Sequence, residues 1–163
     1  MKSKIQKILL RVSSKLKQHK INFAIVGSIS LYLQGMSVNP HDIDIITNKI
    51  GIIKIEKLFR KYKKQGITSE KENLKKSVYF CHFAMFKINN VKIEILADTW
   101  AKNKKTKKIY RSNLKLKRFI VFKKQKIPIM PIEEELKAKE VIMWKPKRIN
   151  KIRKFLKEKE RSK

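Results

Sequence analysis

The sequence predicts an α/β (α+β) domain, a sheet flanked by helices with a short helical C-terminal portion, and three observations predict it. Apolar residues recur three and four positions apart near the N-terminus, as they do in amphipathic helices. Short, almost entirely apolar runs bounded by turn residues follow, as in buried strands, and the two patterns alternate along the chain. The 163 residues are 42% hydrophobic, which is enough for the core of one domain and excludes intrinsic disorder.

The N-terminal third alternates between helix and strand patterns. The spacing of apolar residues predicts an amphipathic helix over Ile5–Leu16, and the nearly continuous apolar run Ile21–Val26 predicts a buried strand that ends at a glycine–serine turn. A second helical stripe covers Ile29–Met36, and the serine of the turn is placed to cap it. The segment His41–Thr47 alternates polar and apolar residues, which predicts a strand with its two aspartates on one face.

A helix, a linker and a hairpin are expected in the middle of the chain. Ile52–Tyr62 has helical spacing, and Gly66 is expected to end this helix. The polar segment Thr68–Lys76 is then expected to be a linker. Val78–Ile88 and Val91–Ala97 flank two asparagines, which tolerate the positive φ angles of a tight hairpin turn.

The C-terminal part is expected to finish the sheet and then to become helical. We expect, in order, a basic loop at 101–108, strands at 109–110 and 119–122, an extended segment at 127–132, a helix from there to about Trp144, and a last helix from Ile149 to about Lys157. The sequence is therefore divided into a core with its N-terminal helix, residues 1–126, and a helical extension packed on that core, residues 127–163. The two parts are expected to form a single domain.

The charge of the chain indicates a polyanionic partner. Lys and Arg number 43 against 13 Asp and Glu, which gives a formal net charge of +30. Such a positive electrostatic field favours nucleic acid over an anionic membrane surface, because the basic residues are spread along the chain. No apolar stretch approaches the length of a membrane span or of a signal-peptide core, and one cysteine excludes a disulfide framework. We therefore expect a cytoplasmic protein that does not enter a membrane.

Three carboxylates and a turn form the constellation that indicates chemistry. Asp42 and Asp44 are two apart on one predicted strand, so their side chains project from the same face, and Glu94 lies between apolar residues of another. Three such acids in one cleft repel one another unless a divalent cation joins them, and Mg²⁺ suits carboxylates and substrate phosphates. Gly27 and Ser28 precede a predicted helix, whose free N–H groups can cradle phosphate.

These residues resemble the nucleotidyltransferase superfamily typified by DNA polymerase beta. The segment Gly27–Gly35 is similar to the Gly-Gly-x-Ala-Leu-x-Leu-x-Gly pattern of the AbiEii-like, type IV toxin–antitoxin nucleotidyltransferases, and Pro131–Lys139 resembles their segment leading into a helix with a functional lysine. The resemblance implies a mixed sheet flanked by helices and a two-metal Mg²⁺ site. It further implies that Asp42 and Asp44 bind Mg²⁺ and that Glu94 assists the cation that activates the acceptor hydroxyl.

The resemblance also implies how the nucleotide is bound. Gly27 and Ser28 would bind the β- and γ-phosphates of an NTP such as ATP, and Lys139 would neutralise triphosphate charge. The chain departs from the pattern ahead of the aspartates, where relatives carry Arg and Thr and this chain has Val38 and Pro40.

Purely structural roles stay open for the same side chains. The two aspartates would then form the solvent-facing side of an edge strand, Glu94 would pair with a hairpin lysine such as Lys87, and Lys139 would lie on a solvated helix face. Ser28 would then be only a helix cap.

The expected function is Mg²⁺-dependent transfer of a nucleoside monophosphate from an NTP to an RNA hydroxyl, with a tRNA 3′ end as the leading acceptor. Two alternatives stay open. The fold could serve as an inactive RNA-binding protein, as the departures ahead of the aspartates suggest, or it could transfer nucleotide onto a protein hydroxyl. The resembled group includes toxins, so a partner protein that restrains the enzyme is also considered.

Overall fold

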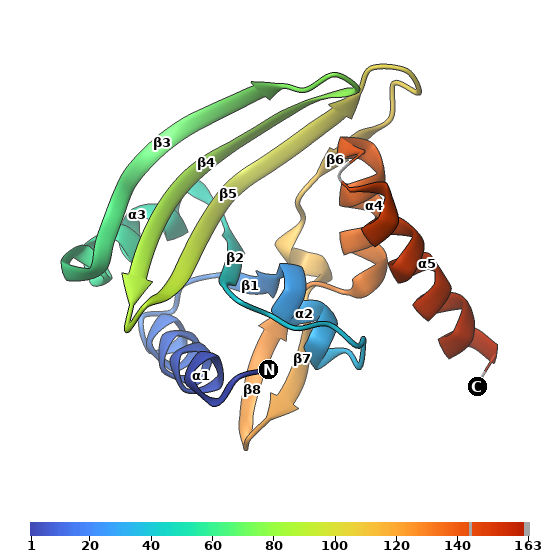
Figure 1. Ribbon diagram of the computed structural model, residues 1–163. Helices are drawn as coiled ribbons and strands as arrows, with labels where there is room; N and C mark the ends of the chain where they lie inside the picture. The colour runs from blue at the N-terminus through green and yellow to red at the C-terminus, as the bar shows by residue number, and fades with distance from the viewer. Residues whose placement is uncertain (144, 162–163) are drawn as a thin grey trace.

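The computed structural model describes residues 1–143 and 145–161, and within them a mixed sheet is flanked by helices (Figure 1). The helices are α1 Ser3–Gln18, α2 Gly27–Leu33, α3 Lys49–Leu58, α4 Ile132–Ile142 and α5 Pro146–Arg161, with short 3₁₀ turns at Arg60–Tyr62 and Leu114–Leu116. The strands are β1 Phe23–Val26, β2 Ile43–Thr47, β3 Lys63–Asn73, β4 Ser77–Ile88, β5 Val91–Asn103, β6 Ile109–Arg111, β7 Arg118–Phe122 and β8 Gln125–Ile129.

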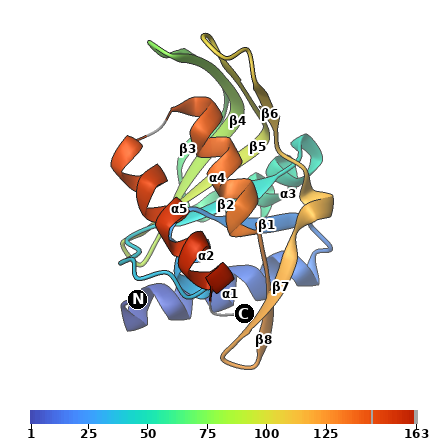
Figure 2. The same cartoon turned by 90° about the vertical axis from the view of Figure 1, so that its right-hand side faces the viewer.

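The sheet has the order β3-β4-β5-β2-β1-β8-β7, with β6 paired to β5. Strand β2 is antiparallel to β1 and parallel to β5, and β1 is parallel to β8, so the sheet is mixed. This confirms the predicted fold class. Figure 2 shows α4 and α5 together on one side of the sheet, while the hairpin of β7 and β8 extends away from them.

The main core lies on the face of the sheet that α1 and α3 cover. Alternate residues of the central strands point into it, among them Ile43 and Ile45 of β2 and Ile93 and Ile95 of β5, all buried. Because side chains alternate between the two faces of a strand, the residue between each of these pairs points to the opposite face. The apolar pattern that builds the core therefore also determines which face receives Asp44.

The expected linker at Thr68–Lys76 is wrong. Residues Lys63–Asn73 form β3, an edge strand that pairs along β4, and Gly66 lies inside this strand, near shifts in its register, rather than at a helix end. An edge strand has solvent on its outer side, so it needs few apolar residues and its polar sequence is typical of a loop. Strand β5 likewise continues to Asn103, which takes up part of the expected basic loop.

Smaller corrections concern helix ends. Helix α2 begins at Gly27 and its N-cap is Val26, so Ser28 is not the cap. The last helix begins earlier than expected, at Pro146, where the fixed φ angle of proline suits a first helical position. Helix α4 ends at Ile142, and Trp144, the expected end, lies outside the described residues.

The division at residue 126 stays a prediction. None of the described helices combines the length and the apolar character needed to cross a bilayer.

Candidate active site

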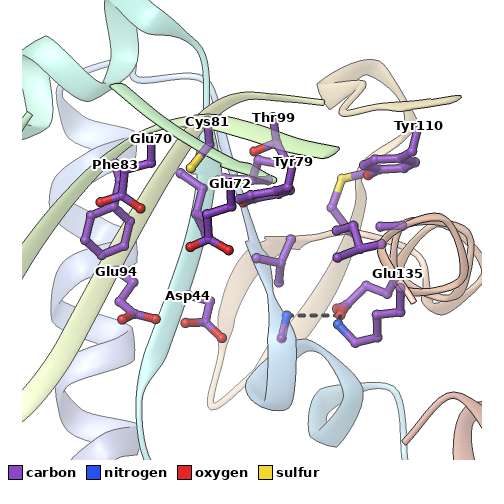
Figure 3. A pocket seen from close by; sticks show the side chains of 18 of the residues that line it. Asp44, Glu70, Glu72, Tyr79, Cys81, Phe83, Glu94, Thr99, Tyr110 and Glu135 are labelled. Atoms are coloured by element: carbon purple, nitrogen blue, oxygen red, sulfur yellow. Dashed lines mark hydrogen bonds and ion pairs between the residues drawn. The ribbon is translucent and has the colours of Figure 1, made fainter. Parts of the chain in front are cut away.

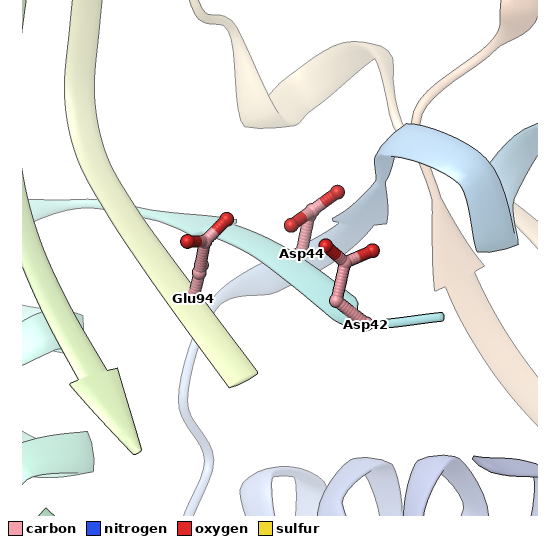
Figure 4. Close-up of side chains that lie close together, drawn as sticks. All are labelled: Asp42, Asp44 and Glu94. Carbon is pink, nitrogen blue, oxygen red and sulfur yellow. The ribbon is translucent and has the colours of Figure 1, made fainter. Parts of the chain in front are cut away.

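The three predicted acids come together on the face of the sheet opposite the main core (Figure 4). Asp42 directly precedes β2, Asp44 lies within it, and Glu94 is the residue of β5 that pairs with Asp44 in the parallel register. Three carboxylate oxygens, one from each residue, lie within 4.8 Å of one another. This spacing allows the three oxygens to coordinate one cation.

The electrostatics of the cluster favour a bound cation. Burial, followed by the neighbouring carboxylates of Asp42 and Glu94, raises the pKa of Asp44 to about 8. A divalent cation among these oxygens would offset both effects, since it replaces the lost hydration and reverses the sign of the local field. The residues present therefore fit a metal site.

Lys92 is a contact of this cluster that the sequence reasoning missed. Its Nζ lies 2.9 Å from Oε1 of Glu94 and 3.7 Å from Oδ2 of Asp42. The hydrogen bond to Glu94 raises the pKa of the lysine. The available signal was the two-residue spacing of Lys92 and Glu94, which places both side chains on one face of β5.

Gly27 brings the first turn of α2 against the acids. It has a φ of +73°, and a Cβ at this position would lie 2.0 Å from Oδ2 of Asp44. Its backbone N–H donates a hydrogen bond of 3.1 Å to Oε2 of Glu135 on α4. Only glycine permits both the left-handed conformation and this approach.

Glu135 and Lys139 join α4 to the same corner. Nζ of Lys139 lies 3.3 Å from the Glu135 Oε2 that also accepts from Gly27, and the Glu135 side chain is 3% exposed. Burial raises the pKa of Glu135, and the ammonium of Lys139 opposes this rise. The other oxygen, Oε1, is buried without a hydrogen-bond partner in the part of the chain that the structure describes. Glu135 was missed because acids in a first helical turn usually serve only the helix dipole.

A cavity of about 440 Å³ opens beside the acids (Figure 3). Five carboxylates line it, together with Lys139, Tyr79, Tyr110 and apolar side chains; the carboxylates are those of Asp44, Glu70, Glu72, Glu94 and Glu135. Glu70 and Glu72 come from β3, where the sequence predicts a linker, so the sequence does not indicate their place in the site.

A second cleft, of about 900 Å³, adjoins the acid cluster at Asp42. Ser28 and Asp42 line it, and helix α5 contributes basic side chains from its first turns, namely Lys147, Arg148 and Lys151. The predicted phosphate ligands are thus divided, because Gly27 and Lys139 line the first cavity while Ser28 lines this cleft.

Comparison with known proteins gives a family and two structural neighbours. The model of the aminoglycoside-2''-adenylyltransferase family matches residues 8–146. A crystal structure of a candidate nucleotidyltransferase from Thermotoga maritima aligns with 28% identity and a TM-score of 0.74, and the alignment covers 97% of this chain and 96% of that one. A lincomycin-bound lincosamide antibiotic adenylyltransferase, LnuA, aligns at 17% identity over 80% of this chain and 82% of its own, with a TM-score of 0.49. A search of curated proteins gave no significant match.

These findings confirm the resemblance to the nucleotidyltransferase superfamily. The closer resemblance to AbiEii-like members stays a prediction, as do the individual roles assigned to the six site residues.

Proposed function

We propose that this chain, a nucleotidyltransferase that belongs to the aminoglycoside-2''-adenylyltransferase family, transfers a nucleoside monophosphate from an NTP to a hydroxyl of a small cationic molecule with the help of Mg²⁺. The observation that carries the proposal is the acidic cavity beside the acid cluster. Five of the chain's 13 acidic residues line it, although the formal net charge is +30.

The three central acids would hold Mg²⁺ and prepare the acceptor. Bound there, Mg²⁺ would supply charge stabilisation for the phosphates and lower the pKa of the acceptor hydroxyl. The hydroxyl oxygen forms a bond to the α-phosphorus, the bond from that phosphorus to the bridging oxygen breaks, and pyrophosphate leaves. Glu94 lies on the β4–β3 side of the cluster, and we assign to it the acceptance of the hydroxyl proton.

The donor and the acceptor would approach from opposite sides. Ser28 and the basic first turns of α5 form the cleft suited to a triphosphate, whose negative charge they complement. The acids of β3 face the other side and attract a cation bearing amino groups, such as the aminoglycosides for which the family is named. Lys139 lines the acceptor cavity and is paired there with Glu135, so its predicted role in neutralising triphosphate charge rests on the sequence resemblance.

An RNA acceptor, with a tRNA 3′ end first, is the second candidate, and the net charge of +30 favours it. The basic cleft beside Asp42 could then receive RNA phosphates instead of the triphosphate. An AbiEii-like toxin role with a restraining partner protein would be one form of this second candidate. Transfer onto a protein hydroxyl and an inactive RNA-binding role are separate alternatives, and all three come from the sequence.

The test is transfer of label from α-³²P-labelled NTPs in the presence of Mg²⁺. Parallel reactions would contain a panel of aminoglycosides, total tRNA, or no added acceptor. Label on an aminoglycoside supports the proposal, label on tRNA supports the second candidate, and label on the protein itself supports protein modification. If no acceptor is labelled while the NTP is bound, the proposal of a small cationic acceptor is refuted.

The acids of β3 provide a prediction for this assay. The double variant Glu70→Gln, Glu72→Gln keeps the shape of the cavity wall but removes two charges, so we expect the KM for a cationic acceptor to rise about tenfold, as for the loss of one to two kcal/mol of ionic attraction. The KM for the NTP should stay within about twofold, because these residues lie away from the basic cleft.

The matched control is Glu158→Gln, Glu160→Gln near the end of α5, which makes the same change in net charge away from the cavity. Equal effects of the two double variants on the acceptor KM would show that only the overall charge matters, and the cavity would lose its assigned role.

A further inference from the structure

The ammonium of Lys92 lies between two members of the acid cluster. It donates a 2.9 Å hydrogen bond to Glu94 and lies 3.7 Å from Asp42, and these two carboxylates flank Asp44. A cation is thus already in contact with two of the three groups that would bind a metal.

The position of Lys92 follows from the geometry of β5. Lys92 and Glu94 are two apart on β5, so both point to the site face, and the parallel pairing of β5 with β2 sets that face beside the aspartates. The lysine side chain is 45% exposed, which leaves its long stem free to move away when the carboxylates take another partner. Strand β5 therefore fixes the backbone of Lys92, whereas the ammonium at the end of its side chain can move away from the carboxylates.

We propose, on the basis of the proposed function, that Lys92 is a positioning residue that competes with the divalent cation shared by Asp42 and Glu94. It offsets the charge of these acids when no metal is bound, and a cation that takes the Glu94 oxygen as a ligand would displace it.

A simple surface ion pair is the alternative, and such pairs contribute little when they are exposed to water. Lys87 separates the two explanations. It is the residue of β4 that pairs directly with Lys92, so it lies on the same face, and among the described ion pairs it has none with the cluster. A general effect of positive charge would be similar for both lysines, whereas competition for the carboxylates belongs to Lys92 alone.

The experiment measures Mn²⁺ binding to the full chain without nucleotide, by the electron paramagnetic resonance signal of free Mn²⁺ and by calorimetry. We expect Lys92→Met to bind Mn²⁺ about tenfold more tightly than the wild type. Lys87→Met should bind like the wild type, and Lys92→Arg, which keeps the charge, should restore weak binding. Asp44→Asn provides the variant that loses the metal site.

Each outcome decides the question. Equal affinity in Lys92→Met and wild type, or an equal gain in Lys87→Met, would refute the competition, and weaker binding in Lys92→Met would mean that the lysine organises the ligands instead. These results would leave the proposed function intact, because the wild type would still bind metal. If neither the wild type nor Lys92→Met binds Mn²⁺, the metal site of the proposed function fails together with this inference.

Discussion

Asp44→Asn is expected to abolish nucleotidyl transfer while making the metal-free protein more stable at neutral pH. The amide keeps the size of the side chain but cannot supply the anionic oxygen at the centre of the cluster, so transfer should fall by at least about 100-fold. The variant also removes a carboxyl group that must take up a proton when the metal-free protein folds at neutral pH, and we expect the free energy of unfolding to rise by about 1–3 kcal/mol at pH 7.5. Label transfer and urea unfolding measure the two effects.

The raised pKa of Asp44 also determines how the free energy of unfolding depends on pH. Because the pKa of Asp44 is raised from 3.8 to about 8, the folded protein holds more protons than the unfolded chain between these values. The contribution of Asp44 to stability therefore falls as the pH rises from about 4 to 8, at no more than about 1.4 kcal/mol per pH unit, and is constant outside that window. Asp44→Asn should lack this slope.

Added Mg²⁺ completes the test. It should raise the unfolding temperature of the wild type near pH 8, where Asp44 loses its proton readily to a bound cation, and leave that of Asp44→Asn unchanged. If Asp44→Asn transfers nucleotide normally, or is less stable than the wild type at neutral pH without metal, Asp44 is not a buried metal ligand.

The central part of the site could be predicted from the sequence because local rules determine it. The apolar residues at 43 and 45 must face the core, and the two-residue period of a strand then sends Asp44 to the opposite face. The glycine–serine turn is similarly local, since a strand that ends at glycine and continues as a helix needs no distant partner to be recognised. These are the features on which the resemblance to nucleotidyltransferases also rested.

The parts that were missed depend on contacts between distant segments. Glu70 and Glu72 line the cavity only because β3 pairs with β4, and nothing in its polar sequence indicates that pairing. Glu135 meets Gly27 across 108 positions of the chain, so its usual role at a helix N-terminus concealed its contact with the site. The parallel register of Asp44 with Glu94 is of the same kind, because it follows from packing across the sheet rather than from either strand alone.

Gly27→Ala is expected to damage both the fold and the reaction, and Gly35→Ala is its matched control. Both glycines have positive φ angles, +73° and +96°, so alanine strains the backbone by about 1–2 kcal/mol at either position. Only at Gly27 does the new Cβ also collide with a carboxylate, at 2.0 Å from Oδ2 of Asp44, whereas at Gly35 the nearest atom is Cζ of Phe155 at 3.8 Å.

The comparison of the two variants therefore separates strain from collision. We expect Gly27→Ala to lose at least about 100-fold in transfer, because a displacement of about 1 Å in Asp44 disrupts the cluster, and to lose more stability than Gly35→Ala. Gly35→Ala should keep transfer within a few-fold of the wild type. Because the N–H of Gly27 also donates to Glu135, the collision should loosen α4 as well, which hydrogen exchange at Glu135 and Lys139 would detect. If the two variants were equally impaired, backbone strain alone would explain the loss, and the close approach of Gly27 to Asp44 would have no part in holding the acids together.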